Sequence, residues 1–473
     1  MKLYNSLTST IEDFIPLKEG KASIYSCGPT VYNHLQIGNL SAFIYADILR
    51  RALLSAGYDV TAVMNITDVD DKTIRDSHRD YPELDPMEAL QKLTQKYETI
   101  FLDDIKRVGN DTSAITFIRA TETIKEMLTL TQHLLDQGFA YPAEDGIYFS
   151  IKAYELAGYT YGQLQHIDRS REHARIANDE YDKDSASDFA LWKKAASDEP
   201  YWDAAFTHEG QEITMPGRPG WHIECSAMSE KLLGVPFDIH TGGIDLKFPH
   251  HENEIAQTAA ATKQPLLARY FVHNNHILVD GKKMSKSLGN FYTLRDIEGK
   301  GFSPQAFRLL VLSGHYRSET HFSWDILEAA QNRLRDYRAM AALKWQSSDK
   351  VHDAMSFTLV DVPTEIAAAL QNDLDTPKAL AYLSYVSQQI QQTLVHTTLL
   401  PHFVAMLEAI DELLGLQLTL EPDITDDQKN KIKQREAARA AKDWQTSDAI
   451  RDELLAQGIA LRDTEIGTIW HRP

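Results

Sequence analysis

The chain has 473 residues, 43% of them hydrophobic and 25% charged, which is ordinary for a globular protein and leaves room for roughly three domains. It contains no apolar run near the ~18 residues of a membrane span, and its first residues do not read as a secretion signal, so we expect a cytoplasmic protein without a membrane segment. The formal net charge of -20 argues against sequence-blind binding to nucleic acids, because such binding depends on many Lys and Arg contacts to phosphates.

The first 66 residues predict a βαβ unit. A strand around residues 24–25, an apolar-periodic helix over 38–56 and a β-rich strand over 58–66 follow one another in that order. Such units place ligands at the carboxyl ends of their strands, where a helix N-terminus offers free N–H groups to phosphate. Residues 27–39 lie at that position, so we expect them to contact a phosphate-bearing ligand.

The rest of the chain predicts further helices and an insertion. Residues 87–140 have the pattern of long amphipathic helices, whereas residues 141–215 are rich in Tyr, Asp and Ser and are expected to be irregular. From 319 to 415 the pattern is helical again, and Asp375 followed by Pro377 supplies a cap and an early proline for one helix. After a polar break at 421–423, we expect helices over about 426–458 and then a hairpin through 469.

A basic segment, Lys283-Met-Ser-Lys-Ser287, follows the α/β region. Lysines beside small polar residues form a loop whose ammonium groups can neutralise the charge that develops on a triphosphate when its bond to the α-phosphorus breaks. A surface turn is the alternative for such a segment taken alone. The order of the residues favours the phosphate role.

Only two cysteines occur, Cys27 and Cys225, and each has Gly, Pro, Trp or His neighbours rather than aliphatic ones. A disulfide is not expected in a reducing cytoplasm. His250 and Glu254 have i, i+4 spacing on a predicted helix, so two thiolates, an imidazole and a carboxylate make a plausible zinc set. Two alternatives remain in the same string: His251 in place of His250 as a ligand, and Glu252 as a general base.

Together these segments resemble the cysteinyl-tRNA synthetases of bacterial type, a class I synthetase family, over nearly the whole chain. The resemblance rests on six motifs: Cys27-Gly-Pro-Thr-Val-Tyr32, Asn65-Ile-Thr-Asp-Val-Asp-Asp-Lys72, Arg218-Pro-Gly-Trp-His-Ile-Glu-Cys-Ser-Ala-Met228, Phe248-Pro-His-His-Glu-Asn-Glu-Ile-Ala-Gln257, Lys283-Met-Ser-Lys-Ser287 and Ser313-Gly-His-Tyr-Arg-Ser318. It implies an α/β fold, with a Rossmann-like catalytic domain over 1–318 that carries an insertion at about 100–215 and the lysine loop at 283–287. A helical bundle over 319–420 and a small α+β anticodon-binding domain over 421–473 are implied to follow.

The resemblance also implies roles for individual residues. One Zn²⁺ per chain is implied to bind the substrate thiolate and to exclude serine, whose hydroxyl stays protonated. Its implied ligands are Cys27, Cys225, His250 and Glu254. Thr67, Trp221 and His240 are implied to line the cysteine pocket. For ATP with Mg²⁺, the implied binding residues are Gly38, Asp245, Met284, Ser285 and Lys286, and the implied catalytic residues are Gln36, Asn39, Lys283 and Lys286.

The turn before the first helix departs from the family pattern. The family has His-Ile-Gly-His or His-Ile-Gly-Asn, whereas this chain has Gln36-Ile37-Gly38-Asn39. A Gln amide can donate a hydrogen bond to a phosphoryl oxygen, but it cannot carry positive charge. His34 is a candidate substitute. Smaller departures are Thr241 and Asn275, each where the family usually has Gly, and a longer segment over 199–215.

The C-terminal region matches the family's anticodon-binding pattern. Aromatic planes stack unpaired bases, while Arg and Asp side chains read base edges. Six basic residues and one acid lie between 429 and 442; such a run taken alone favours a solvated helix face, and beside the anticodon-binding pattern it can present a basic face to phosphate. The residues that match are Arg439, Trp444, Asp448, Asp463 and Trp470, of which the last has a core role as its alternative.

The sequence therefore predicts a ligase that activates L-cysteine with ATP and transfers it to the 3′ end of tRNA-Cys, acting as a monomer. A cysteine ligase of thiol-cofactor synthesis is one alternative, although that enzyme lacks an anticodon domain. A catalytically silent, synthetase-like RNA-binding protein is the other, motivated by Gln36. The intact lysine loop and the four candidate ligands argue against it.

Overall fold

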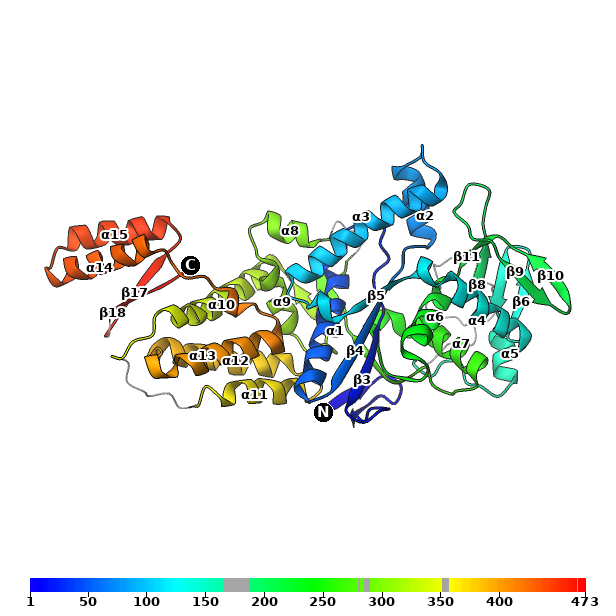
Figure 1. Ribbon diagram of the computed structural model, residues 1–473, viewed down its shortest axis with the longest axis horizontal. Helices are drawn as coiled ribbons and strands as arrows, with labels where there is room; N and C mark the ends of the chain where they lie inside the picture. The colour runs from blue at the N-terminus through cyan, green and yellow to red at the C-terminus, as the bar shows by residue number, and fades with distance from the viewer. Residues whose placement is uncertain (166–186, 280, 285–289, 351–356, 466) are drawn as a thin grey trace. The chain divides into compact units, whose positions relative to one another are not determined.

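The computed structural model describes residues 1–473 except 166–186, 280, 285–289, 351–356 and 466 (Figure 1). It divides into two compact units. The first comprises Met1–Leu278, Lys283–Leu294 and Tyr316–Glu319, and the second Val279–Lys282, Arg295–His315 and Thr320–Pro473. Among the described residues, we find no helix with both the length and the apolar character needed to cross a bilayer.

A five-stranded parallel sheet with the order β13-β12-β3-β4-β5 forms the centre of the first unit. Its apolar residues are buried, as expected for a parallel sheet covered on both faces. From β3 the chain proceeds to β4 and β5 on one side, and later to β12 and β13 on the other. The direction of winding therefore reverses beside β3, where ligands bind in such sheets. The strands are β3 (Lys21–Ser26), β4 (Asp59–Ile66), β5 (Thr116–Arg119), β12 (Phe237–Gly243) and β13 (Ala268–Asn274).

The predicted βαβ unit is confirmed, with α1 (Ile37–Ser55) between β3 and β4. Long helices were predicted over 87–140, and α3 (Pro86–Arg107) and α4 (Ile124–Asp136) fulfil that prediction. The prediction missed β5, whose four residues are too few to establish an alternating pattern. The other helices of this unit are α2 (Asp71–Asp80), α5 (Ile151–Leu156), α6 (Trp221–Leu233) and α7 (Glu252–Thr262).

The prediction that residues 141–215 are irregular was wrong for the described part of that segment. β6 (Ala140–Ala143), β7 (Gly146–Phe149), β8 (Phe189–Lys194) and β11 (Gly217–Pro219) form an antiparallel sheet in the order β11-β8-β7-β6. A hairpin of β9 (Ala205–His208) and β10 (Gln211–Thr214) follows β8. Trp192 of β8 is fully buried and donates to the carbonyl of Met215, so the core of this sheet depends on residues far apart in the sequence.

The second unit begins with helices. α12 (Thr376–Thr393) starts as predicted, because Asp375 accepts from Lys378 N and Pro377 lies in the first turn. The predicted terminal helices and hairpin are confirmed: α14 (Asp426–Ala440) and α15 (Trp444–Ala456) lie side by side, and β17 (Ala460–Thr464) pairs with β18 (Gly467–His471) (Figure 1). The remaining elements of the chain are β1 (Lys2–Asn5), β2 (Thr10–Asp13), β14 (Ile277–Val279), β15 (Lys282–Lys283), α8 (Leu294–Gly299), α9 (Pro304–Leu312), β16 (Thr320–Phe322), α10 (Trp324–Ala341), α11 (Asp361–Leu370) and α13 (Leu400–Leu414).

Candidate active site

A cavity of about 450 Å³ lies in the first unit, next to the carboxyl end of β3 and the N-terminus of α1. Its position agrees with the reversal point of the parallel sheet. Seven of the predicted site residues line it: Cys27, Gln36, Gly38, Asn39, Trp221, Asp245 and Met284. The structure therefore brings together residues from five separate segments of the sequence.

The turn that enters α1 presents Gln36 to this cavity. Gln36 occupies the N-cap position with extended backbone, and within the described chain its side chain makes no cap hydrogen bond. The amide is therefore available to a ligand. Gly38 has a steric role, because a Cβ there would lie 2.6 Å from Cε of Met284. His34, the candidate substitute for a missing cation, lines the same cavity.

The segments that follow β3 and β4 are held tightly together. The Gly28 amide donates to Oδ1 of Asn65 at 2.8 Å, and the Thr67 amide donates to the Pro29 carbonyl at 3.0 Å. A Cβ at Gly28 would lie 1.7 Å from the Asn65 carbonyl oxygen, so this position accepts only glycine without displacement of the backbone. The close approach fixes where Cys27 and Thr67 stand relative to each other.

Four predicted metal ligands converge at one side of the cavity. One potential ligand atom from each of Cys27, Cys225, His250 and Glu254 lies within 4.8 Å of the other three, and all four residues are buried. The two Sγ atoms are 3.9 Å apart, and His250 Nε2 lies 3.2 Å from Glu254 Oε1. Cys27 follows β3, Cys225 is on α6, and Glu254 is in the first turn of α7.

The donor set suits a divalent soft metal such as zinc. No described residue donates a hydrogen bond to Oε1 of Glu254, although this atom is buried. Burial raises the pKa of the Cys27 thiol, with the neighbouring Cys225 adding to the effect, and burial lowers the pKa of His250 to about 3 although Glu254 opposes that shift. A cation here would favour both thiolates and use the neutral imidazole as a ligand.

His251 remains a geometric alternative to His250. Its Nε2 lies 3.3 Å from Sγ of Cys27, and a second cluster of Cys27, His240, His251 and Glu254 meets the same distance limit. Glu252, the other alternative, accepts hydrogen bonds from the amides of Gly162 and Leu164. Its carboxylate thus anchors a neighbouring loop, which argues against a role as general base.

Three predicted pocket residues surround the ligand cluster. The Trp221 ring stacks on His250 with centroids 4.2 Å apart and faces the cavity. Nε2 of His240 lies 2.9 Å from Oε2 of Glu254. Thr67 and His240 are both buried and are not part of the cavity lining, so they lie beneath the cavity surface.

Sequence reasoning missed Glu224. Its carboxylate is fully buried and accepts a hydrogen bond from the Thr67 hydroxyl at 3.0 Å. The amide of Asn65 also donates to that hydroxyl, at 3.1 Å. Thr67 is therefore oriented from two sides. The signal was present in the motif, because Glu224 directly precedes the candidate ligand Cys225.

Part of the lysine loop cannot be compared with its prediction. Ser285, Lys286 and the side chain of Lys283 lie outside the described residues. Met284 is described and lines the cavity. Asp245 also lines it, and the absence of a Cβ at Gly243 makes room for its carboxylate, whose Oδ1 would lie 2.6 Å from such an atom.

The predicted anticodon residues lie in the second unit. Nη1 of Arg439 is 3.1 Å from Oδ2 of Asp463, and its guanidinium lies 5.8 Å from the Trp444 ring centroid, so these three residues are adjacent. Asp448 is exposed on α15. Trp470 is buried in a core with Ile432, Leu454 and Leu461, which supports its alternative role as a core residue.

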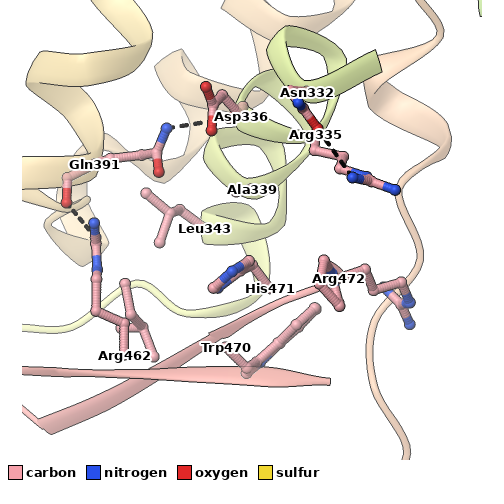
Figure 2. Close-up of a pocket in the computed structure, with 12 residues that line it drawn as sticks. Asn332, Arg335, Asp336, Ala339, Leu343, Gln391, Arg462, Trp470, His471 and Arg472 are labelled. Carbon is pink, nitrogen blue, oxygen red and sulfur yellow. Dashed lines mark hydrogen bonds between the residues drawn. The ribbon is translucent and has the colours of Figure 1, made fainter. Parts of the chain in front are cut away.

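A second cavity, of about 380 Å³, lies between α10 and the β17–β18 hairpin, and Arg462 is among the hairpin residues that line it (Figure 2). Arg462 points across it and donates to the Gln391 carbonyl, while Gln391 donates to the carbonyl of Asp336 at 3.1 Å. These contacts attach β17 to the helices that precede it. Arg462 and Asp463 are neighbours on one strand and therefore project to opposite faces.

Comparison with known proteins identifies the family. A model described as the class I (C) tRNA synthetase catalytic domain matches residues 13–332, and a cysteinyl-tRNA ligase anticodon-binding domain model matches residues 421–470. The chain belongs to the cysteinyl-tRNA synthetase family. Relatives named cysteine–tRNA ligase from Chlamydia muridarum and Leptospira interrogans are each 39% identical, the first over 98% of both chains and the second over 100% of this chain and 99% of its own. The relative of that name from Bacillus licheniformis is 38% identical over 100% of this chain and 99% of its own.

Solved structures confirm the class I synthetase fold. Mycobacterium tuberculosis methionyl-tRNA synthetase has a TM-score of 0.57 at 12% identity and covers 85% of this chain and 93% of its own. A leucyl-tRNA synthetase from Agrobacterium radiobacter has a TM-score of 0.58 at 11% identity and covers 87% of both chains. The predicted Rossmann-like α/β fold is thereby confirmed for this family member.

Proposed function

We propose that this chain is an active cysteine–tRNA ligase, which activates L-cysteine with ATP and transfers it to the 3′ end of tRNA-Cys. The observation that carries the proposal is one cavity lined both by Cys27, a member of the four-donor cluster, and by the N-terminus of α1. A ligand in this cavity can therefore contact a thiol-selecting site at one end and a phosphate-binding helix N-terminus at the other. Membership of the family, over both catalytic and anticodon-binding regions, supports this assignment.

Cys27, Cys225, His250 and Glu254 would hold one Zn²⁺. When bound there, the metal supplies affinity for a thiolate that a serine hydroxyl does not match. Such a difference in chemistry permits discrimination without an editing site, whereas apolar pockets distinguish one methylene by only ~1–3 kcal/mol. The two free, buried cysteines also suit a reducing, cytoplasmic compartment.

The chain's own residues would position cysteine beside ATP. Trp221 closes one side of the cavity, and Thr67, held by Glu224, has a remaining lone pair for the substrate ammonium group. Asp245 would accept hydrogen bonds from the ribose hydroxyls. His240, whose Nε2 contacts the Glu254 carboxylate, would lie near the substrate sulfur.

Adenylate formation would take place at the entry to α1. A cysteine carboxylate oxygen attacks the α-phosphorus, and the bond to the β-phosphate bridging oxygen breaks to release pyrophosphate with its Mg²⁺. Gln36 and Asn39 would donate to phosphoryl oxygens beside the backbone N–H of Gly38. In the lysine loop, Lys283 and Lys286 would neutralise the departing pyrophosphate. Met284 and Ser285 would contribute to ATP binding.

The second step would use the tRNA. A hydroxyl of its terminal ribose attacks the carbonyl carbon of cysteinyl-adenylate, AMP leaves, and the ribose proton passes to the released phosphate. Arg439, Trp444, Asp448 and Asp463 would recognise the anticodon. We propose that the chain acts as a monomer, with the catalytic domain over 1–318 and its insertion at about 100–215, the bundle over 319–420 and the anticodon domain over 421–473.

Cysteine-dependent pyrophosphate exchange followed by charging of tRNA-Cys transcripts tests the proposal. The ligase shows both activities. Exchange without charging would instead favour a small-molecule cysteine ligase, and tRNA binding without exchange by zinc-loaded protein would favour the silent RNA-binding alternative. Either of these results contradicts the proposed function.

A further inference from the structure

The carboxylate of Asp463 is surrounded by hydrogen-bond donors. Oδ1 accepts from Nη1 of Arg435 at 2.7 Å and from Oγ1 of Thr468 at 2.9 Å. Oδ2 accepts from Nη2 of Arg435 at 2.9 Å and lies 3.1 Å from Nη1 of Arg439. Because a carboxylate offers about four acceptor positions, this one has room for a further donor only if a present donor leaves.

The two arginines that contact Asp463 differ in accessibility. Arg435 is 1% exposed and makes a bidentate pair from inside the domain, whereas the Arg439 side chain is 39% exposed. Sequence reasoning had placed Arg435 on a basic face for phosphate, and its burial overturns that placement. Withdrawal of Arg435 would leave a buried, unpaired cation, but Arg439 can leave Asp463 and enter water at little cost.

The β17–β18 hairpin that carries Asp463 is held on both faces, and Thr468 is the residue of β18 that pairs with Asp463. Behind it, the Thr468 amide donates to Oε1 of Glu436 at 2.7 Å, next to Arg435 on α14. On the opposite face, Arg462 reaches the Gln391 carbonyl across the second cavity (Figure 2). The carboxylate therefore has a fixed position, and its orientation depends on the bidentate pair with Arg435.

The outer oxygen of this carboxylate is adjacent to a stacking surface. Trp444 is 55% exposed, and the Arg439 guanidinium lies near its ring at 5.8 Å. An unpaired nucleobase that stacked on this ring would bring its exocyclic amino group toward the position that Arg439 occupies. Hydrogen bonds from Arg435 lower the pKa of Asp463 to about 2, so the acceptor is ionised at neutral pH.

We propose that Arg435 is the positioning residue that orients Asp463 for base reading, and that Arg439 is an exchangeable group that leaves Asp463 when the amino group of an unpaired base binds. This inference rests on the proposed function, because it assumes that the C-terminal domain reads the anticodon of tRNA-Cys. The fixed contact of the Asp463 carboxylate is thereby assigned to Arg435 and the exchangeable contact to Arg439, and both arginines are on α14.

Arg435→Lys tests the positioning role, because lysine keeps the charge and loses the planar fork. The readout is the ratio of kcat/KM for charging a tRNA-Cys transcript and a transcript with one anticodon base replaced. We expect this ratio to fall by about 10-fold to 100-fold, the usual value of one bidentate contact in base discrimination. Pyrophosphate exchange without tRNA stays at the wild-type rate.

Lys433→Gln is the matched control, since Lys433 is an exposed cation on the same helix. Loss of a phosphate contact lowers charging of both transcripts by the same factor and leaves their ratio unchanged. Arg439→Ala removes the exchangeable contact and leaves the bidentate pair of Arg435 with Asp463, so we expect it to reduce the ratio less than Arg435→Lys does.

Asp463→Asn provides a second arm in case a buried lysine unfolds the domain, because Asp463 is partly exposed. The proposal requires Asp463→Asn to reduce the ratio of kcat/KM for the two transcripts as well. Adding Arg435→Lys to Asp463→Asn should reduce that ratio no further. An enzyme that charges tRNA-Cys normally while Arg435→Lys or Asp463→Asn keeps the wild-type ratio overturns the inference alone. A ratio lost with Arg439→Ala but retained with Arg435→Lys also overturns it. Absence of exchange and charging in the wild type contradicts the proposed function instead.

Discussion

Gly28→Ala is expected to disable cysteine activation through a backbone overlap. The added Cβ would lie 1.7 Å from the Asn65 carbonyl oxygen and 2.8 Å from the Asn65 carbonyl carbon. Because real Cβ contacts lie beyond 3.0 Å, the segments after β3 and β4 must separate by roughly 1.3 Å. These segments carry Cys27 and Thr67. A displacement of ~1 Å in a catalytic site costs about 100-fold in rate, so we expect a loss of that size in kcat/KM for cysteine-dependent pyrophosphate exchange.

Gly299→Ala is the matched control for this substitution. A Cβ at Gly299, in α8, meets nothing within 4 Å, and the residue is exposed. We expect unchanged exchange and up to ~1 kcal/mol of added stability from the better helix former. Thermal unfolding monitored in parallel separates loss of the fold from loss of the site. An exchange rate for Gly28→Ala within threefold of the wild type would refute the reasoning.

Three further predictions concern charge, metal and phosphate chemistry. Burial raises the pKa of Asp68 to about 6 from 3.8, so the contribution of this group to stability is greatest below about pH 4 and is lost as pH rises to about 6. The difference between wild type and Asp68→Asn in urea unfolding should therefore change by about 3 kcal/mol over this range, and a flat difference would contradict it. Cys225→Ser should reduce bound zinc, measured by metal analysis, and abolish exchange while tRNA binding persists; full zinc occupancy would disprove the ligand assignment. Gln36→His should raise kcat for exchange about tenfold with KM for cysteine unchanged, because the Gln36 amide can donate a hydrogen bond to a phosphoryl oxygen but cannot carry positive charge; a decrease would show that another group supplies that charge.

The candidate site was largely predictable because its residues belong to short segments with local meaning. The strand, turn and helix from β3 to α1 follow from periodicity, and they place Cys27 and Gln36 near each other through the chain itself. The i, i+4 spacing of His250 and Glu254 likewise needs no distant information, and their atoms lie 3.2 Å apart. Cys225 joined this set only because it is the second of the two cysteines in the sequence, since no local pattern relates α6 to α7.

The remainder depends on contacts between distant residues. The four-stranded sheet pairs β7 with β8 across about 40 residues, and strands of three to six residues are too short to carry a clear alternating pattern. Arg435 shows the same limit for a charged side chain. Its helix reads as a basic solvated face, and only the pairing with Asp463 on a later strand explains why it is buried.

Cysteine-dependent pyrophosphate exchange by the zinc-loaded chain, with serine as the competing amino acid, tests the central claim most directly. We expect exchange with cysteine and a rate with serine that is lower by about 100-fold or more, which exceeds what one apolar contact can supply. We also expect that removal of zinc by a chelator abolishes exchange with cysteine and that restored zinc recovers it. Comparable rates with cysteine and serine, or no exchange with either, would contradict the account.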